Sequence, residues 1–326
     1  MAQGSSGRAF RTAPTESTTF LPRQFGRHGA VASNSYLATQ AGRDILKDGG
    51  NAVDAAVGGV LVEGVVNPQM ATLGGECPAL IRMADGPVTA INGNMCAPRA
   101  ATPAAYRDRG YTAMPESDIL AAGVPATFGA LVTALQRHGR RPLAAVAEPA
   151  RDLCRNGFPA HAGLVNQEKF GIAALADTFR EQWPESAAVY LPGGAVPAVG
   201  EYLTNPALAD TLQHLIDAEQ RAGGDRGAKL QAAHDAFYTG EIAAAVAAFS
   251  AGRDGLLGRD DMAAFTTRVE APLHLDYAGA RIHKCGPWSQ GPAFLQALAI
   301  LKHTDLAGMA HNGADYLHTL IEAIKL

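Results

Sequence analysis

Apolar residues recur at helical spacing near the start of the chain. Leu37, Ala41 and Ile45 follow one another every four residues, which places them on one face of a helix. The pair Gly49-Gly50 comes next, and glycine readily adopts the left-handed backbone that ends many helices. We therefore predict a first amphipathic helix that stops just before this pair.

A second helix is predicted directly after the glycine pair. Asn51 is a good N-cap residue, and Asp54 stands three positions later, where its carboxylate can reach back to the capping backbone. From Ala52 to Val66 the chain is small or aliphatic nearly all round. A helix without a polar face is expected to be buried between layers.

The remaining pattern predicts a mixture of strands and helices. Strands are expected at residues 31–33, 79–83, 88–91, 267–275 and 280–284, and helices at 127–136, through much of 140–250 and from Pro292. We divide the chain into a flexible N-terminal arm, residues 1–28, and one compact α/β unit, residues 29–326.

The last predicted helix carries an apolar stripe. The stripe consists of Tyr316, Leu317, Leu320, Ile321 and Ile324. An apolar stripe needs a partner surface, and the helical pattern reaches Leu326 without a cap, glycine or proline. We expect more polypeptide beyond this point.

Composition and charge exclude several classes of protein. The 326 residues are 47% hydrophobic and 18% charged, as in ordinary globular proteins, and the net charge of -4 disfavours nucleic-acid binding. No segment reaches the roughly 20 apolar residues of a membrane span. The first residues lack the apolar core of a secretory signal, so we expect a cytoplasmic location, or a periplasmic one if a leader was removed.

Cysteine and histidine spacing argues against metal chemistry. The four cysteines are far apart and form no CxxC pair, and the ten histidines form no HExxH motif. We expect reduced thiols, no metal and no cofactor. A rival hypothesis is a Cys96 nucleophile paired with His28 or His283, although no spacing links them and a free cysteine is usually a small buried hydrophobe.

An ordered series of motifs resembles the large subunit of the gamma-glutamyltranspeptidase family. The motifs lie at 49–56 (GGNAVDAA), 67–69 (NPQ), 74–75 (GG), 97–100, 123–125, 156–159, 236–243, 255–257, 260–265, 289–291 and 314–318. They span roughly residues 28 to 326, and their agreement in sequence order is what makes the resemblance specific.

The resemblance implies an N-terminal-nucleophile hydrolase with a four-layer αββα sandwich completed by a second subunit. The partner, cut from the same precursor, would begin with a threonine whose hydroxyl attacks an amide carbonyl while its α-amine acts as the base. No catalytic residue is then expected in this chain. A dimer of such heterodimers is a further expectation, and the other partner is a small-molecule amide substrate.

Asn94 is the first candidate for substrate binding. By resemblance, it stands where the family carries an arginine that grips the α-carboxylate of a γ-glutamyl group. An amide lacks the charge and reach of that guanidinium, so γ-glutamyl binding should be severely weakened. Arg99 is nearby but matches a separate downstream position. The alternative is a capped turn in which Asn94 bonds its own backbone.

Three further residues are candidates for the substrate pocket. Trp288 and Gln290, in a strand-to-helix turn, could line an acyl pocket or only pack that turn. Glu76 replaces a family glycine and could be either a polar pocket group or a solvated turn residue. Ser289, between the first two, does not form a nucleophile elbow because Pro287 replaces the required glycine.

We thus favour the large subunit of an autoprocessed amidohydrolase acting on a small carboxylate-bearing amide. The alternatives are a true γ-glutamyl hydrolase or transferase, and a non-catalytic member that binds a ligand or partner.

Overall fold

The computed structural model describes residues 25–115 and 117–326 of the chain. Two compact units are distinguished, residues 1–30 and residues 31–326. Most of the predicted N-terminal arm, residues 1–24, lies outside the described residues. The division into an arm at 1–28 and a single domain at 29–326 stays a prediction.

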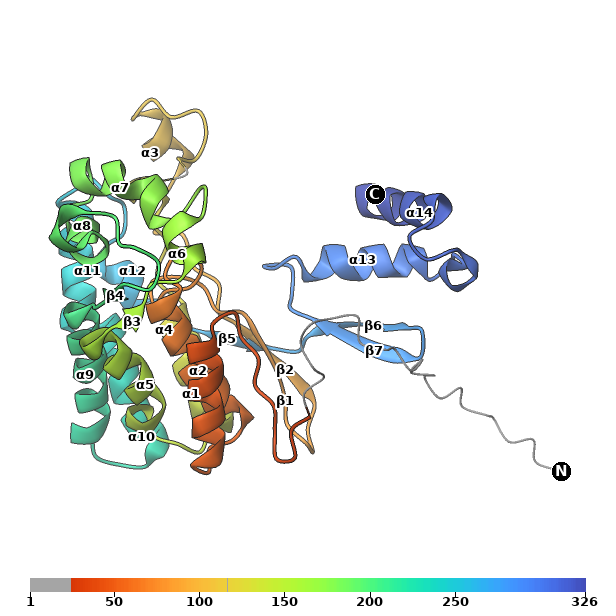
Figure 1. Cartoon of the computed structure of the whole chain (residues 1–326), viewed down its shortest axis with the longest axis horizontal. Helices are drawn as coiled ribbons and strands as arrows, with labels where there is room; N and C mark the ends of the chain where they lie inside the picture. Colours follow the sequence, from red (N-terminus) through yellow and green to blue (C-terminus); the bar gives the residue numbers. More distant parts are fainter. Residues whose placement is uncertain (1–24, 116) are drawn as a thin grey trace. The chain divides into compact units, whose positions relative to one another are not determined.

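Helices dominate the larger unit, as the sequence predicted for residues 140–250 (Figure 1). The helices are α1 (Tyr36–Lys47), α2 (Ala52–Val66), α3 (Pro103–Arg107), α4 (Thr127–His138), α5 (Leu143–Asn156), α6 (Ala162–Asn166), α7 (Ile172–Glu181), α8 (Pro184–Tyr190), α9 (Pro206–Arg221), α10 (Arg226–Tyr238), α11 (Glu241–Ala251), α12 (Arg259–Ala263), α13 (Gly291–Leu301) and α14 (Ala314–Lys325).

The first two helices begin and end where the capping residues predict. Gly49 has a φ of 90°, in the left-handed region, and follows the end of α1. The Asn51 side chain accepts hydrogen bonds from the N–H groups of Val53 and Asp54, and the Asp54 carboxylate accepts one from the N–H of Asn51. This capping box confirms the predicted start of α2.

The buried core lies where α2 packs against its neighbouring helices. Helix α2 contacts α1, α4 and α5, and α9 packs against α5 and α10. Within α2, Val57, Leu61 and Val62 are at most 3% exposed. The expectation that the all-apolar helix is buried is therefore confirmed for most of its residues, although Ala52 and Ala56 are exposed.

The strands form three small antiparallel sheets. Strands β1 (Ala79–Arg82), β2 (Val88–Asn92) and β5 (Arg268–Glu270) form one sheet in that order. Strand β3 (Phe158–Pro159) pairs with β4 (Tyr202–Leu203), and β6 (Leu273–Tyr277) pairs with β7 (Ala280–Lys284). The predicted mixture of helix and sheet is confirmed.

Two predicted strands differ from the structure. Residues 31–33 form no strand, although Val31 packs against the hydrophobic core. The single strand expected at 267–275 is two strands, β5 and β6, separated by Ala271 and Pro272. Proline has no N–H to donate to a ladder, which explains why the strand is interrupted there.

Among the described residues, no helix combines the length and the apolar character needed to span a membrane.

Candidate functional site

The register of β2 and β5 gathers polar side chains on one face of their sheet. Asn92 pairs with Arg268, and Ile91 pairs with Val269. Because side chains alternate along a strand, Asn92, Arg268 and Glu270 share one face while Ile91, which is fully buried, belongs to the other. The end of β2 therefore presents polar groups on the face opposite Ile91.

The loop after β2 is tied to the turn between β7 and α13. The Nδ2 of Asn94 donates a hydrogen bond of 2.7 Å to the backbone oxygen of Trp288. The indole Nε1 of Trp288 donates in turn to Oε2 of Glu270, at 2.8 Å. Two of the predicted site residues, Asn94 and Trp288, are thus brought into direct contact, although 194 residues separate them in sequence.

This contact excludes one of the two interpretations of Asn94, and its role in substrate binding stays a prediction. The turn is capped by Asn92, whose Oδ1 accepts a hydrogen bond from the N–H of Asn94 at 3.1 Å. The Asn94 amide is directed instead to Trp288. The alternative in which the Asn94 side chain bonds its own backbone is therefore wrong. The Asn94 side chain instead helps to position the turn that contains Trp288.

Glu76 belongs to the same cluster, whereas Gln290 does not. Glu76 is exposed, and its Oε1 accepts a hydrogen bond from the N–H of Met95, next to Asn94. Gln290 is exposed at the N-cap position of α13, and its side chain makes no hydrogen bond within the described part of the chain. Its predicted role in substrate binding remains a prediction.

Ser289 has a structural role in the same turn. Its Oγ donates to the backbone oxygen of Gly286 and accepts from the N–H of Gly291. Both bonds hold the turn that presents Trp288. The hydroxyl is therefore engaged with the backbone, in agreement with the interpretation that Ser289 is not a nucleophile.

Asn92 and Glu270 belong to the cluster but were not predicted from the sequence. Glu270 accepts from Trp288, and the Nδ2 of Asn92 lies 3.5 Å from its Oε1. The sequence alternates polar and apolar residues within 267–275, where Arg268 and Glu270 flank the apolar Val269. This alternation places Glu270 on the polar face of the strand, but its role as an acceptor is visible only when β5 is aligned with β2.

The Cys96 hypothesis finds no support in the geometry. Cys96 forms an isolated backbone bridge with Val124, and it lines a small cavity that contains no histidine. His283 stands opposite His274 on the β6–β7 ladder, with ring centres 5.8 Å apart. His28 belongs to the other compact unit.

The four thiols should differ strongly in reactivity. Cys96 is exposed, whereas burial raises the pKa of Cys77 to about 11 and that of Cys154 to about 12. At pH 8 we expect iodoacetamide to alkylate Cys96 at least about tenfold faster than the other three, because the thiolate is the reactive form. Peptide mass spectrometry over time measures this, and equal rates at Cys77 and Cys96 would contradict it.

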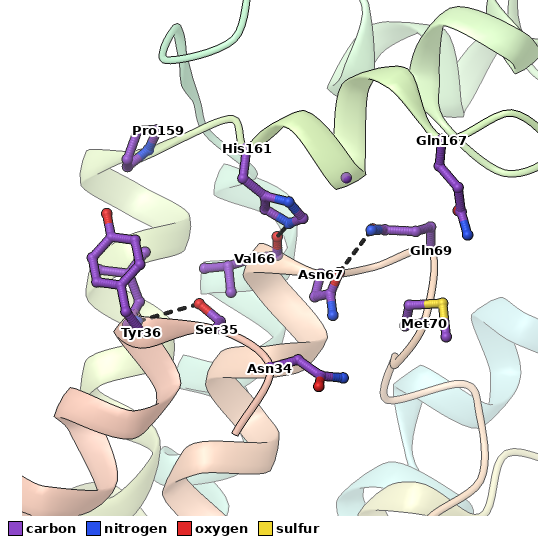
Figure 2. A pocket seen from close by; sticks show the side chains of 12 residues that line it. Asn34, Ser35, Tyr36, Val66, Asn67, Gln69, Met70, Pro159, His161 and Gln167 are labelled. Atoms are coloured by element: carbon purple, nitrogen blue, oxygen red, sulfur yellow. Dashed lines mark hydrogen bonds between the residues drawn. The ribbon is translucent and has the colours of Figure 1, made fainter. Parts of the chain in front are cut away.

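A larger cavity, of about 390 Å³, lies between the start of α1, the end of α2 and the start of α6 (Figure 2). His161 lines it, but its Nδ1 accepts from the N–H of Leu164 and its Nε2 contacts the backbone oxygen of Val66. Both ring nitrogens are therefore engaged. Asn67 and Gln69 are hydrogen-bonded to each other. These contacts leave the cavity without an evident base or nucleophile.

No group of three or more His, Cys, Asp or Glu within residues 25–115 and 117–326 is placed to hold a metal ion.

Comparison with known proteins assigns the chain to a family. The family model described as gamma-glutamyltranspeptidase matches residues 38–326. The chain is 33% identical to the glutathione hydrolase-like YwrD proenzyme of Bacillus subtilis (strain 168), over 92% of the chain and 54% of that protein. It is 32% identical to the acylase ACY 1 proenzyme of Pseudomonas sp. (strain SE83), over 92% of the chain and 52% of that protein.

The fold supports the same assignment. The structure of cephalosporin acylase from Bacillus halodurans superposes with a TM-score of 0.81 and 29% identity, covering 94% of this chain and 56% of that one. The chain thus spans about half the length of these three relatives. The matched model and relatives establish that this chain belongs to the gamma-glutamyltranspeptidase family and corresponds to its large subunit.

Proposed function

We propose that this chain is the large subunit of an autoprocessed amidohydrolase that cleaves the amide of a small carboxylate-bearing compound. Its partner would be a small subunit from the same precursor with an N-terminal threonine. The YwrD and ACY 1 relatives are proenzymes, and the chain covers about half of their length. The cluster around Asn94 consists of amides, carboxylates and an indole, which suit substrate recognition better than nucleophilic attack.

Apolar surface on the larger unit supports a partner. On α14, Leu317, Ile321 and Ile324 are 44%, 55% and 74% exposed. A second apolar surface is a cavity of about 300 Å³ lined by residues of α2, α4 and β1. Exposed apolar surface of this kind is typical of protein interfaces.

In the proposed reaction the partner supplies the chemistry and this chain supplies the binding surface. The threonine hydroxyl attacks the amide carbonyl, its proton passes to the α-amine, and the leaving amine departs with a proton. Water then hydrolyses the acyl-enzyme. A dimer of heterodimers and a cytoplasmic location also remain proposals.

The substrate assignment rests on one observation, which is the lack of charge and the hydrogen bonding of the Asn94 side chain. The residue is uncharged, and its amide is already bonded to the backbone oxygen of Trp288. A γ-glutamyl α-carboxylate would find no guanidinium at this position. Each hydrogen bond to a charged group contributes about 1.5–3 kcal/mol, so the absence of two weakens such binding severely.

A second candidate is a true γ-glutamyl hydrolase or transferase, favoured by the 33% identity to a glutathione hydrolase-like proenzyme. The two candidates predict different rates for the complete protein. Under our proposal, γ-glutamyl-p-nitroanilide should be a poor substrate of the wild-type protein, because the residue at position 94 carries no guanidinium for its α-carboxylate. Strong turnover of the γ-glutamyl compound by the wild-type protein would favour the second candidate.

The variant Asn94→Arg tests whether the residue at position 94 faces the carboxylate of the substrate. We expect kcat/KM for γ-glutamyl-p-nitroanilide to rise by about tenfold or more, because a guanidinium makes charge-assisted bonds to a carboxylate. Asn34→Arg, on an exposed asparagine before α1, is the matched control and should leave the rate unchanged. No gain from Asn94→Arg over that control would argue against Asn94 facing the substrate.

A third candidate, a non-catalytic member of the family, would show a single uncut polypeptide on a denaturing gel and no turnover of p-nitroanilide substrates.

A further inference from the structure

A small cavity beside the Asn94 cluster is lined by two exposed arginine residues. Its volume is about 180 Å³, and Cys96, Arg99, Val124, Asp261, Phe265 and Arg268 are among its lining residues. Arg99 lies in the segment between β2 and α3, whereas Arg268 begins β5. The cavity thus joins two segments that are distant in sequence.

Both guanidinium groups are available to a ligand. Within the described residues, neither the Arg99 nor the Arg268 side chain makes a hydrogen bond or an ion pair, and Arg99 contacts Asp261 only through its backbone N–H. Asp261 is the acidic residue of the lining, and its oxygens accept from the N–H groups of Arg99 and Gly258, at 3.0 and 2.9 Å. With two arginines and one aspartate, the lining carries a net charge of +1.

The cavity adjoins the site already described. Arg268 lies directly across the ladder from Asn92 and on the same sheet face as Glu270. Cys96, which also lines the cavity, is two residues beyond Asn94. A substrate bound at the Asn94–Trp288 contact could therefore place a terminal group among the arginines.

We propose that Arg99 and Arg268 bind the carboxylate of the substrate and so determine specificity. The inference rests on the proposed function and identifies how the carboxylate would be recognised. A planar guanidinium matches a carboxylate with two parallel hydrogen bonds. The volume accommodates a carboxylate with a few carbons, being smaller than the roughly 300 Å³ at which pockets for drug-sized ligands begin. Asp261 disfavours a second negative charge.

The first test uses the complete protein and does not depend on turnover. Cys96 lies in the same cavity, so a bound carboxylate should shield its thiol from iodoacetamide. We expect 50 mM glutarate to slow alkylation of Cys96 several-fold relative to glutaramide, with sodium chloride matching the ionic strength. Arg268→Gln and Arg99→Gln should each reduce this protection, whereas Arg137→Gln, on the exposed surface of α4, should preserve it.

The second test separates binding from chemistry. For glutaryl-p-nitroanilide, Arg268→Gln should raise KM by about tenfold and change kcat by less than about twofold, since the lost bonds hold a group remote from the reacting carbonyl. For butyryl-p-nitroanilide, which has no carboxylate, both constants should stay at wild-type values. That substrate also confirms that the variant is folded.

The outcomes distinguish the two proposals. If glutarate protects Cys96 but neither anilide is hydrolysed, the anion site stands and the proposed function fails. If the anilides are hydrolysed while glutarate gives no protection and both arginine variants keep the wild-type KM for the glutaryl compound, the anion site is overturned.

Discussion

Asp54→Ala should lower the free energy of unfolding by about 3 kcal/mol or more, because it leaves several buried N–H groups without an acceptor. Asp54 is completely buried in the first turn of α2. Its carboxylate accepts from the N–H groups of Asn51, Arg140 and Arg141, at 2.8 to 3.1 Å. One side chain therefore both caps α2 and ties it to the segment that follows α4.

Urea unfolding followed by circular dichroism measures this loss. Asp54→Asn keeps the shape and one acceptor oxygen, so we expect an intermediate loss. Asp44→Ala is the control, because Asp44 lies on α1 with a solvent-exposed side chain paired to Arg43, and exposed ion pairs contribute only about 0–1 kcal/mol. Equal urea midpoints for Asp54→Ala and Asp44→Ala would contradict the structural role.

Gly93→Ala is expected to disrupt the candidate site. A Cβ at this position would lie 2.1 Å from the backbone oxygen of Cys77 and 3.0 Å from the Cβ of Ala130. The backbone must shift, and Gly93 accepts a hydrogen bond from the N–H of Cys77 and immediately precedes Asn94. We expect a stability loss of about 1–3 kcal/mol and, since a 1 Å displacement of a positioning group can cost about a hundredfold in rate, a comparable fall in kcat/KM.

The matched control for this change is Gly86→Ala, between β1 and β2. An added Cβ there meets nothing closer than the Cβ of Met83 at 3.9 Å. We expect wild-type turnover of glutaryl-p-nitroanilide and an unchanged melting temperature for this control. Wild-type kinetics for Gly93→Ala would show that the loop after β2 does not position the substrate.

Local signals predicted the helices better than the strands. The start of α2 follows from Asn51 and Asp54, which act within one turn, so the sequence contained all the information that was needed. Residues 31–33 have strand-like composition but no paired neighbour, and a strand depends on its partner. Pro272 interrupts the pattern that suggested one continuous strand.

The candidate site was only partly predictable because its contacts join residues that are distant in sequence. Family resemblance identified Asn94, and the turn composition identified Trp288, but no spacing rule could pair residues 194 positions apart. Glu270 was missed because its acceptor role is visible only when β5 is aligned with β2. Arg268 becomes a candidate only through the cavity it shares with Arg99.

The most direct measurement is the N-terminal residue of each polypeptide that copurifies with this chain when its complete gene is expressed. Edman degradation and intact mass together supply it. We predict a second polypeptide that begins with threonine and completes the fold together with this chain. A protein that hydrolyses glutaryl-p-nitroanilide as a single uncut chain, or with a partner beginning with a residue that has no nucleophilic side chain, would contradict it.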